Sequence, residues 1–273
     1  MMDKCPVCFR HCEIKEGGLG FCKARGCVDG KIVPLNYGLL TSSGLDPIEK
    51  KPLRRFHPGS KILSVGSYGC NLSCPFCQNF EISQFDLSHD SSKVSPDSLI
   101  ELALELKANG NIGIAFTYNE PLVSYEFVRD AAKLAKEKNL LTVLVTNGEC
   151  SIEVLDEILP YIDAMNIDLK GFSQGFYSYV GGSFEMVRAF IEHAYKKCHV
   201  ELTSLVIPGK NDSVEMMEEE AKWIASLDKG IPLHLSRYFP RYKEKIPPTE
   251  EKSLLELKLI AEKYLDYVYL GNL

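Results

Sequence analysis

The chain has 273 residues, 45% of them hydrophobic and 25% charged, which suits a globular protein with a sizeable core. Its formal net charge of −6 argues against broad electrostatic binding of nucleic acid. No apolar run approaches the roughly 20 residues that cross a bilayer, and the first residues lack the apolar segment of a signal peptide. Ten cysteines without an export signal predict a cytoplasmic protein whose thiols bind metal in a reducing compartment.

A first group of cysteines lies within residues 4–27. Cys5, Cys8, Cys12 and Cys22 supply four thiols, enough for a closed tetrahedral zinc site or for an auxiliary iron–sulfur cluster. The glycines between Cys12 and Cys22 allow the backbone to turn tightly around such a centre. The pattern predicts a second metal site, and leaves zinc, an iron–sulfur cluster and metal-free thiols as the three alternatives.

Residues 28–60 are predicted to form an extended hairpin that leads into the main domain. The segment 31–37 has strand composition, and Pro34 within it indicates an edge strand. The basic residues that follow are predicted to form a solvated face, with contact to a substrate or an acidic partner as the alternative; they are Lys50, Lys51, Arg54 and Arg55. We therefore divide the chain into a cysteine-rich N-terminal segment, residues 1–60, and a main domain, residues 61–273.

From residue 61 onward, predicted strands alternate with predicted helices. The strands are expected at 62–65, 112–116, 141–146, 164–168, 200–205 and 233–236, with a weaker one at 267–270. The helices are expected at 96–109, 124–139, 151–159, 184–197, 213–227 and 250–265. Such alternation implies parallel strands joined by right-handed crossovers. We predict an α/β fold, a partial (β/α)6 TIM-like barrel with a small cysteine-rich N-terminal extension, whose active site lies at the carboxyl ends of the strands.

A second group of cysteines lies on the loop that leaves the first predicted strand. Cys70, Cys74 and Cys77 fall at offsets 0, 4 and 7. Cys74 and Cys77 alone have the spacing of a dithiol redox motif, and structural zinc normally has four protein ligands. Three cysteines on an iron–sulfur cubane would leave one iron without a protein ligand, and that iron is an open coordination site. The loop lies at the end of the predicted barrel where the active site is expected.

Polar side chains follow the carboxyl ends of the later strands. They are Tyr118, Asn119 and Glu120 after the second strand, Thr146 and Asn147 after the third, Asp168 and Lys170 after the fourth, and His234 and Arg237 in the sixth. Asp168 and Lys170 share one strand face and must be paired or bound inside a barrel mouth. His234 and Arg237 are predicted as the last polar pair facing that mouth. Each set has a structural alternative. Residues 118–120 could form a turn that caps the next helix, Asp168 and Lys170 could form an internal ion pair, and His234 could be a core histidine.

Three further segments carry weaker predictions. Residues 171–182 are rich in glycine and aromatic residues, which indicates a flexible loop that covers the site or packs on the barrel. Asp212 and Glu215 have the spacing of an N-terminal capping box variant. Cys150 and Cys198 are isolated in the sequence and are predicted to be ordinary buried thiols.

The cysteine loop resembles that of the radical S-adenosylmethionine (SAM) superfamily. Together with 117–121, 146–148, 168–170, 207–212, 234–237 and the N-terminal cysteines, it is similar to the AmmeMemoRadiSam-system radical SAM enzymes, relatives of pyruvate formate-lyase activating enzyme. The resemblance implies a [4Fe–4S] cluster on Cys70, Cys74 and Cys77 with SAM on the open iron. It also implies a SAM site and catalytic positions: Phe76, Tyr118, Asn119, Glu120, Thr146, Asn147 and Asp168 for SAM, and Lys170, His234 and Arg237 for catalysis.

The activity implied by this resemblance is reductive cleavage of SAM to a 5′-deoxyadenosyl radical. The electron would come from a flavodoxin or ferredoxin, and the radical would abstract hydrogen from a backbone glycine of a glycyl-radical enzyme. Neither nucleic acid nor a membrane is expected as a partner. Two other functions stay open at this point: a radical SAM enzyme that modifies a small molecule or another protein, and a zinc-binding module without radical chemistry.

Overall fold

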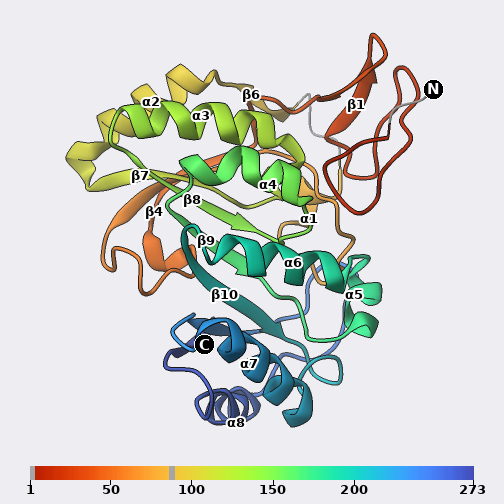
Figure 1. Ribbon diagram of the computed structural model, residues 1–273, viewed down its shortest axis with the longest axis vertical. Helices are drawn as coiled ribbons and strands as arrows, with labels where there is room; N and C mark the ends of the chain where they lie inside the picture. The colour runs from red at the N-terminus through yellow and green to blue at the C-terminus, as the bar shows by residue number, and fades with distance from the viewer. Residues whose placement is uncertain (1–3, 86–89) are drawn as a thin grey trace.

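One sheet of eight strands carries the fold (Figure 1). The computed structural model describes residues 4–85 and 90–273. In spatial order the strands are β12 (Val268–Gly271), β11 (Leu233–Arg237), β10 (His199–Val206), β9 (Ala164–Asp168), β8 (Leu141–Thr146), β7 (Asn111–Phe116), β5 (Lys61–Gly66) and β4 (Ser42–Pro47). All neighbours pair in parallel except β4, which runs antiparallel to β5. The predicted strands are therefore confirmed, including the weak last one.

Helices connect each parallel strand to the next and cover the outer face of the sheet (Figure 1). They are α2 (Pro96–Glu105), α3 (Tyr125–Glu137), α4 (Ile152–Ile158), α5 (Gln174–Val180) with α6 (Phe184–Ala194), α7 (Val214–Asp228) and α8 (Glu251–Ala261). Six strand–helix crossovers result, as the (β/α)6 prediction requires. Serine caps the amino terminus of most of them with a hydroxyl that accepts a backbone N–H: Ser95, Ser151, Ser173, Ser183 and Ser213.

Of the three apolar clusters among the described residues, two lie on opposite faces of the sheet. The larger lies between the sheet and the helices. The smaller lies inside the partial barrel, where Ile62, Ala115, Val143 and Ala164 from four adjacent strands meet Leu53 of the segment before β5. Because strand side chains alternate between faces, one strand contributes to both cores. The segment 48–57 therefore closes the end of the barrel at which the strands begin.

Polar contacts hold this closing segment in place. The backbone N–H groups of Arg54 and Arg55 donate to the carboxylate of Glu201 at 3.0 and 2.7 Å. Asn166 donates to the carbonyl of Pro52 at 2.9 Å. Glu201 is fully buried, so the carboxylate takes these donors in place of water. Below, we call residues 48–57 the plug.

The N-terminal segment lies to one side of the sheet, where β1 (Arg25–Val28) and β2 (Lys31–Pro34) form an antiparallel hairpin (Figure 1). A second short pair joins β3 (Leu39–Leu40) to β6 (Ser92–Lys93). Gly69 packs directly on this segment: its φ is +91°, and a Cβ there would come within 2.5 Å of the carbonyl oxygen of Cys22. Only glycine fits this close approach. The N-terminal segment therefore rests on the loop that carries Cys70.

Four expectations differ from the structure. Residues 42–47 form β4 and join the main sheet, although they were assigned to the N-terminal segment. The aromatic segment after β9 is not a flexible loop, since residues 174–180 form helix α5. Ser213 caps α7, whereas Asp212 accepts from the backbone N–H of Gly209. Lys51 is buried and paired with Asp46 at 2.9 Å, so it does not belong to a solvated face.

Cys150 and Cys198 were predicted to be ordinary buried thiols. Cys150 is 2% exposed, as expected, and Cys198 is half-buried with its thiol 3.7 Å from the carbonyl of Ala194. Cys27 is buried with its thiol 3.5 Å from Glu16. Over residues 4–85 and 90–273, no helix is long and apolar enough to cross a membrane.

Candidate active site

A cavity of about 590 Å³ opens at the carboxyl ends of the strands. Its volume lies within the range of small-molecule and cofactor sites. Cys70, Cys74 and Cys77 all line it, and no other thiol of the described residues does. Most of the residues predicted from the strand ends line it as well: Phe76, Tyr118, Asn119, Glu120, Thr146, Asn147, Asp168, Lys170 and His234. The structure therefore brings the two sets of sequence signals together in one site.

The cysteine loop is fastened on both sides. On one side Ser73 donates its N–H to Val180 at the end of α5 at 2.9 Å, and Phe76, 3% exposed, packs near Phe176 of the same helix. On the other side the N–H groups of Lys243 and Glu244 donate to the carbonyl of Pro75 at 2.9 and 3.0 Å. These contacts fix the thiols without using their sulfur atoms. Phe76 thus anchors the loop and also lines the cavity.

The chemistry of these thiols fits an iron–sulfur cluster. Burial raises the pKa of Cys74 to about 12 and also raises the pKa values of Cys70 and Cys77. Thiolates at this depth therefore need a bound cation to offset their charge. Donors to sulfur are also present: the Leu72 N–H lies 3.4 Å and the Asn147 amide 3.6 Å from the Cys70 sulfur. Three cysteinates with hydrogen-bonded sulfur are the ligand set of a cubane with one open iron.

Asn119 holds the beginning of the same loop. Its Oδ1 accepts from the N–H of Ser67 at 3.0 Å, and its Nδ2 donates to the carbonyls of Tyr68 and Gly69, both at 3.1 Å. Both polar atoms of the side chain therefore form hydrogen bonds with backbone groups of the residues just before Cys70. From the geometry, Asn119 positions the loop, and its role in binding SAM stays a prediction.

We expect Asn119→Ala to destabilise the protein by about 1–3 kcal/mol, because it leaves the Ser67 N–H without its acceptor. Urea unfolding would measure this change, and iron content after reconstitution would report the state of the loop. The matched control is Asn79→Ala, which removes an exposed amide bonded to the Tyr118 carbonyl at 2.7 Å. That change should stay within about 0.5 kcal/mol. Equal effects for the two variants would contradict the positioning role.

Glu120 is a buried carboxyl that joins β7 to β8. It accepts from the Thr146 hydroxyl at 2.8 Å, from the Asn147 N–H at 2.8 Å and from the Leu122 N–H at 3.0 Å. Burial raises its pKa to about 7 despite these donors. The side chain thus locks the two strand ends that line the cavity, and it brings the Asn147 amide next to Cys70.

Tyr118 adopts a left-handed backbone conformation, with φ of +74°. Such a conformation is strained in a bulky residue and is held by its surroundings. Its hydroxyl donates to Asp46 of β4 at 2.8 Å, and Asp46 in turn pairs with the buried ammonium of Lys51. The Tyr118 ring therefore ties the antiparallel edge strand to the rim of the cavity.

Asp168 and Lys170 form an ion pair inside the cavity, with 2.7 Å between the ammonium nitrogen and a carboxylate oxygen. The two side chains share one face, as strand alternation predicted, and they form the internal ion pair that was the alternative interpretation. Burial opposes the charged ammonium, but Asp168 outweighs that effect and raises the pKa of Lys170. The pair is a fixed dipole at the rim, close enough to the cysteines that Lys170 also favours the thiolate form of Cys74.

The structure separates His234 from Arg237, which were predicted as one pair facing the mouth. His234 lines the cavity and bonds to Glu201 at 2.6 Å. Arg237 lies three residues later on the strand, and it donates to the carbonyl of Thr249 and to Glu251 of α8, each at 2.8 Å. An odd offset along a strand reverses the face, so Arg237 points away from the cavity-lining side chains.

Glu201 is a residue that the sequence did not single out. It lies in β10, whose other polar residues are His199, Thr203 and Ser204, and it belongs to no motif that marked it. Its two carboxylate oxygens accept from the plug and bond to His234 and, at 3.0 Å, to His199. These contacts hold the pKa of Glu201 down at about 2, against the opposing effect of burial. Glu201 therefore joins the floor of the cavity to the plug.

Glu149 is a second buried carboxyl that was missed. One oxygen accepts from the Ser183 N–H at 2.8 Å, and the other has no hydrogen-bond partner among the described residues. Its backbone carbonyl accepts from the side chain of Asn71, the residue after Cys70. Burial raises its pKa to about 8. Glu149 is thus held neutral near the cysteine loop.

This raised pKa predicts a pH dependence. A carboxyl whose pKa rises from 4.5 to about 8 on folding favours the folded state below pH 4.5, and the benefit is lost as the pH rises through 8. The isosteric Glu149→Gln should remove that loss. Between pH 5 and pH 8 the free energy of unfolding of the native chain should fall, relative to that of Glu149→Gln, by on the order of 4 kcal/mol. Urea unfolding across this range tests it, and parallel pH profiles would contradict it.

Comparison with known proteins decides the family. The profile described as "Radical SAM superfamily" matches residues 64–224, which hold the cysteine loop and the strand ends through β10. The chain belongs to the radical SAM superfamily. This radical SAM chain is also 38% identical over 281 residues to an uncharacterized protein of Methanocaldococcus jannaschii, covering 98% of the chain and 81% of that protein.

Two further comparisons concern activating enzymes. The radical SAM chain is 27% identical over 219 residues to a putative glycyl-radical enzyme activating enzyme of M. jannaschii, covering 77% of the chain and 80% of that protein. The crystal structure of a domain of pyruvate-formate lyase-activating enzyme from Bacteroides vulgatus aligns with a TM-score of 0.53 at 21% identity, covering 59% of the chain and 99% of that domain. At that identity the structural match speaks for the fold. The resemblance seen in the sequence is confirmed at the level of an enzyme of the radical SAM kind.

Proposed function

We propose that this chain cleaves SAM reductively and acts as an activating enzyme of the glycyl-radical type. The observation that carries the proposal is the convergence of three cysteines with the Asp168–Lys170 pair in one cavity of cofactor size. The relative described as a putative glycyl-radical enzyme activating enzyme supports the activating type. Held by these residues, a [4Fe–4S] cluster and SAM would supply the radical chemistry that removes a hydrogen atom from the substrate.

The chain's own residues bind and orient the reactants. Cys70, Cys74 and Cys77 would hold the cluster, and Asn147 donates a hydrogen bond toward the Cys70 sulfur. Asp168 offers a carboxylate to the cationic or hydroxyl groups of SAM, while Lys170 balances its charge. His234 lies in the same cavity and contributes a polar wall. Leu72 and Phe76 are buried beside the thiols, and apolar surroundings of this kind strengthen electrostatic contacts.

The partners follow from the same proposal. A flavodoxin or ferredoxin would donate the single electron, and the substrate would be a glycine in the backbone of a glycyl-radical enzyme. The setting would be the cytoplasm, where low-potential donors and reduced thiols coexist. The proposal also includes a second metal group on the N-terminal cysteines, whose nature is argued in the next subsection.

The first test measures SAM cleavage. The reconstituted protein, kept anaerobic and reduced with dithionite, should convert SAM to 5′-deoxyadenosine and methionine. Adding a candidate glycyl-radical enzyme should then produce the doublet of a glycyl radical in its electron paramagnetic resonance (EPR) spectrum. Cleavage without any glycyl radical on the candidates would keep radical SAM chemistry and contradict the activating type. No cleavage at all would contradict both.

A small anionic substrate is the second candidate function. Lys50 and Arg54 line the cavity on the side of the plug, and among the described residues Arg54 has no ion-pair partner. Lys50 pairs with Asp46 at 3.4 Å, so it is Arg54 that would favour a carboxylate or phosphate group on the ligand. Transfer of deuterium from a labelled small acid into 5′-deoxyadenosine would favour this function, and transfer from a glycine-labelled protein would favour the first.

A further inference from the structure

We propose that Cys5, Cys8, Cys12 and Cys22 hold a [4Fe–4S] cluster of their own, with every iron bound by a protein thiolate. The inference goes beyond SAM cleavage, because it concerns a second site in the N-terminal segment. It also decides between two metals that the sequence left open, zinc and iron.

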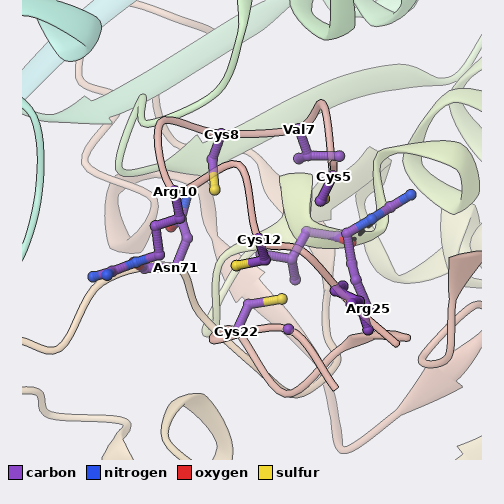
Figure 2. A pocket seen from close by; sticks show the side chains of 11 residues that line it. Cys5, Val7, Cys8, Arg10, Cys12, Cys22, Arg25 and Asn71 are labelled. Carbon is purple, nitrogen blue, oxygen red and sulfur yellow. Dashed lines mark hydrogen bonds between the residues drawn. The ribbon is translucent and has the colours of Figure 1, made fainter. Parts of the chain in front are cut away.

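The four thiols face one small enclosed cavity. All four cysteines line it, together with apolar side chains such as Val7 and Ile14. Figure 2 shows these side chains in the pocket, with the sulfur atoms of Cys8, Cys12 and Cys22 in view. Backbone bonds close the turn that presents them, with the Cys5 N–H 2.9 Å from the carbonyl of Cys12. These thiols are not joined in disulfides. The arrangement is a preformed thiolate site.

The size of this cavity argues for a cluster and against one zinc ion. Zinc lies about 2.3 Å from each thiolate sulfur, which brings four sulfurs to roughly 3.8 Å from one another and leaves no room between them. Here the eleven residues that line the pocket leave about 10 Å³ of space for the centres of water-sized spheres, whereas four sulfurs in contact around one zinc ion would leave none. Among residues 4–85 and 90–273, no three His, Cys, Asp or Glu side chains converge closely enough to hold a single metal ion.

A cubane accounts for thiols that lie farther apart than the four ligands of one zinc ion. It binds each cysteine through a different iron, so its ligands surround a cluster and do not meet at a point. The same reasoning applies to the loop of Cys70, which also lacks a single-ion geometry. The difference between the two sites lies in the number of ligands. Four thiols close the N-terminal site, whereas three leave the other one open.

Positive groups surround the N-terminal site and suit an anionic cluster. Arg10 and Arg25 both line the cavity. Arg25 is 3% exposed and pairs with Glu126, yet its Nε has no hydrogen-bond partner among the described residues. A buried donor without a partner points to an acceptor that completes the site. Backbone N–H groups of Ala24 and Arg25 also point at the Cys22 sulfur, as hydrogen bonds to cluster thiolates do.

The proposed cluster lies against the loop that holds the first one. Arg10 donates from its Nε to the carbonyl of Asn71 at 2.7 Å, and Asn71 lines the N-terminal cavity (Figure 2). Asn71 follows Cys70 directly in the chain. Gly69, on the other side of Cys70, packs on the carbonyl of Cys22. Residues 69–71, which include Cys70, therefore lie directly against the N-terminal site.

Counting metal tests the proposal without measuring activity. The native chain, reconstituted anaerobically, should bind about eight irons and eight sulfides and no stoichiometric zinc, four irons for each cubane. The triple variant Cys70→Ala, Cys74→Ala, Cys77→Ala should keep about four irons and, when reduced, the EPR signal of a [4Fe–4S] cluster. The double variant Cys5→Ala, Cys22→Ala should lose about four of the eight.

Two variants serve as matched controls. Cys27→Ala removes a thiol of the N-terminal segment that does not line the cavity, and Cys150→Ala removes a buried thiol of the main domain. Both should keep the native iron count. About four irons with one zinc in the native chain would overturn the proposal, as would about four irons without zinc. The iron count of the native chain alone can refute the proposal, even if the triple variant fails to fold.

Discussion

Cys70→Ala should form no 5′-deoxyadenosine above background, a loss of more than about 100-fold, since even an outer-shell partner of a metal is worth roughly 10–100-fold. The reason is the ligand count. Cys70, Cys74 and Cys77 are the only thiols of the described residues that line the cavity, so none can replace a missing ligand. Anaerobic reconstitution, reduction with dithionite and chromatography of the products would measure the loss.

The matched control for this variant is Cys198→Ala. Cys198 is half-buried at the amino end of β10, it bonds to Ala194, and it does not line the cavity. Its replacement should leave cleavage close to the native rate. Product formation by Cys70→Ala at a comparable rate would refute the assignment of the cluster ligands, whatever the iron count.

Glu201→Ala should lower the free energy of unfolding by about 3–5 kcal/mol, the range for breaking a buried charged network. The variant leaves two N–H groups of the plug without acceptors and frees His234, which is 5% exposed. Urea unfolding at neutral pH would measure the change. The control is Asp156→Ala, which breaks an exposed pair with His193 and should change stability by less than about 1 kcal/mol.

The same residue predicts a dependence on pH of opposite sign to that of Glu149. A pKa held at about 2 in the folded state, against 4.5 in the unfolded state, gives stability that is present above pH 4.5 and lost as the pH falls through 2. The gap between the native chain and Glu201→Ala should therefore shrink by roughly 3 kcal/mol between pH 5 and pH 2. A gap that stays constant over this range would contradict the ionised, hydrogen-bonded state of Glu201.

Most strands and helices were predicted from the sequence because strand and helix patterns alternate regularly from residue 61 onward. Parallel strands buried on both faces are short apolar runs, and serine at five helix starts marks the boundaries. Ser95 with Pro96 is one such start, and Ser183 is another. The cysteine loop was found because its spacing is specific and its place after β5 agrees with the barrel rule.

The predictions that failed concern residues whose environment depends on distant parts of the chain. Strand β4 has no alternation of apolar side chains, and its place in the sheet depends on pairing with β5 and on the hydrogen bond from the Tyr118 hydroxyl to Asp46. Lys51 looks like one of four solvated cations until Asp46 and the fold bury it. Arg237 was assigned to the cavity from its distance to His234 in sequence, although an offset of three reverses the strand face. Glu201 has no local signal at all.

The plug also has a consequence for biosynthesis. Residues 48–57 leave the ribosome before every strand of the main parallel sheet, yet Arg54 bonds to Glu201, 147 residues later in the chain. At roughly 5–20 residues per second, that interval lasts about 7–30 s. During this time Leu53 and its neighbours have no barrel to fill, and the N-terminal thiols have no finished loop to rest on. We expect the nascent chain to depend on chaperones over this period.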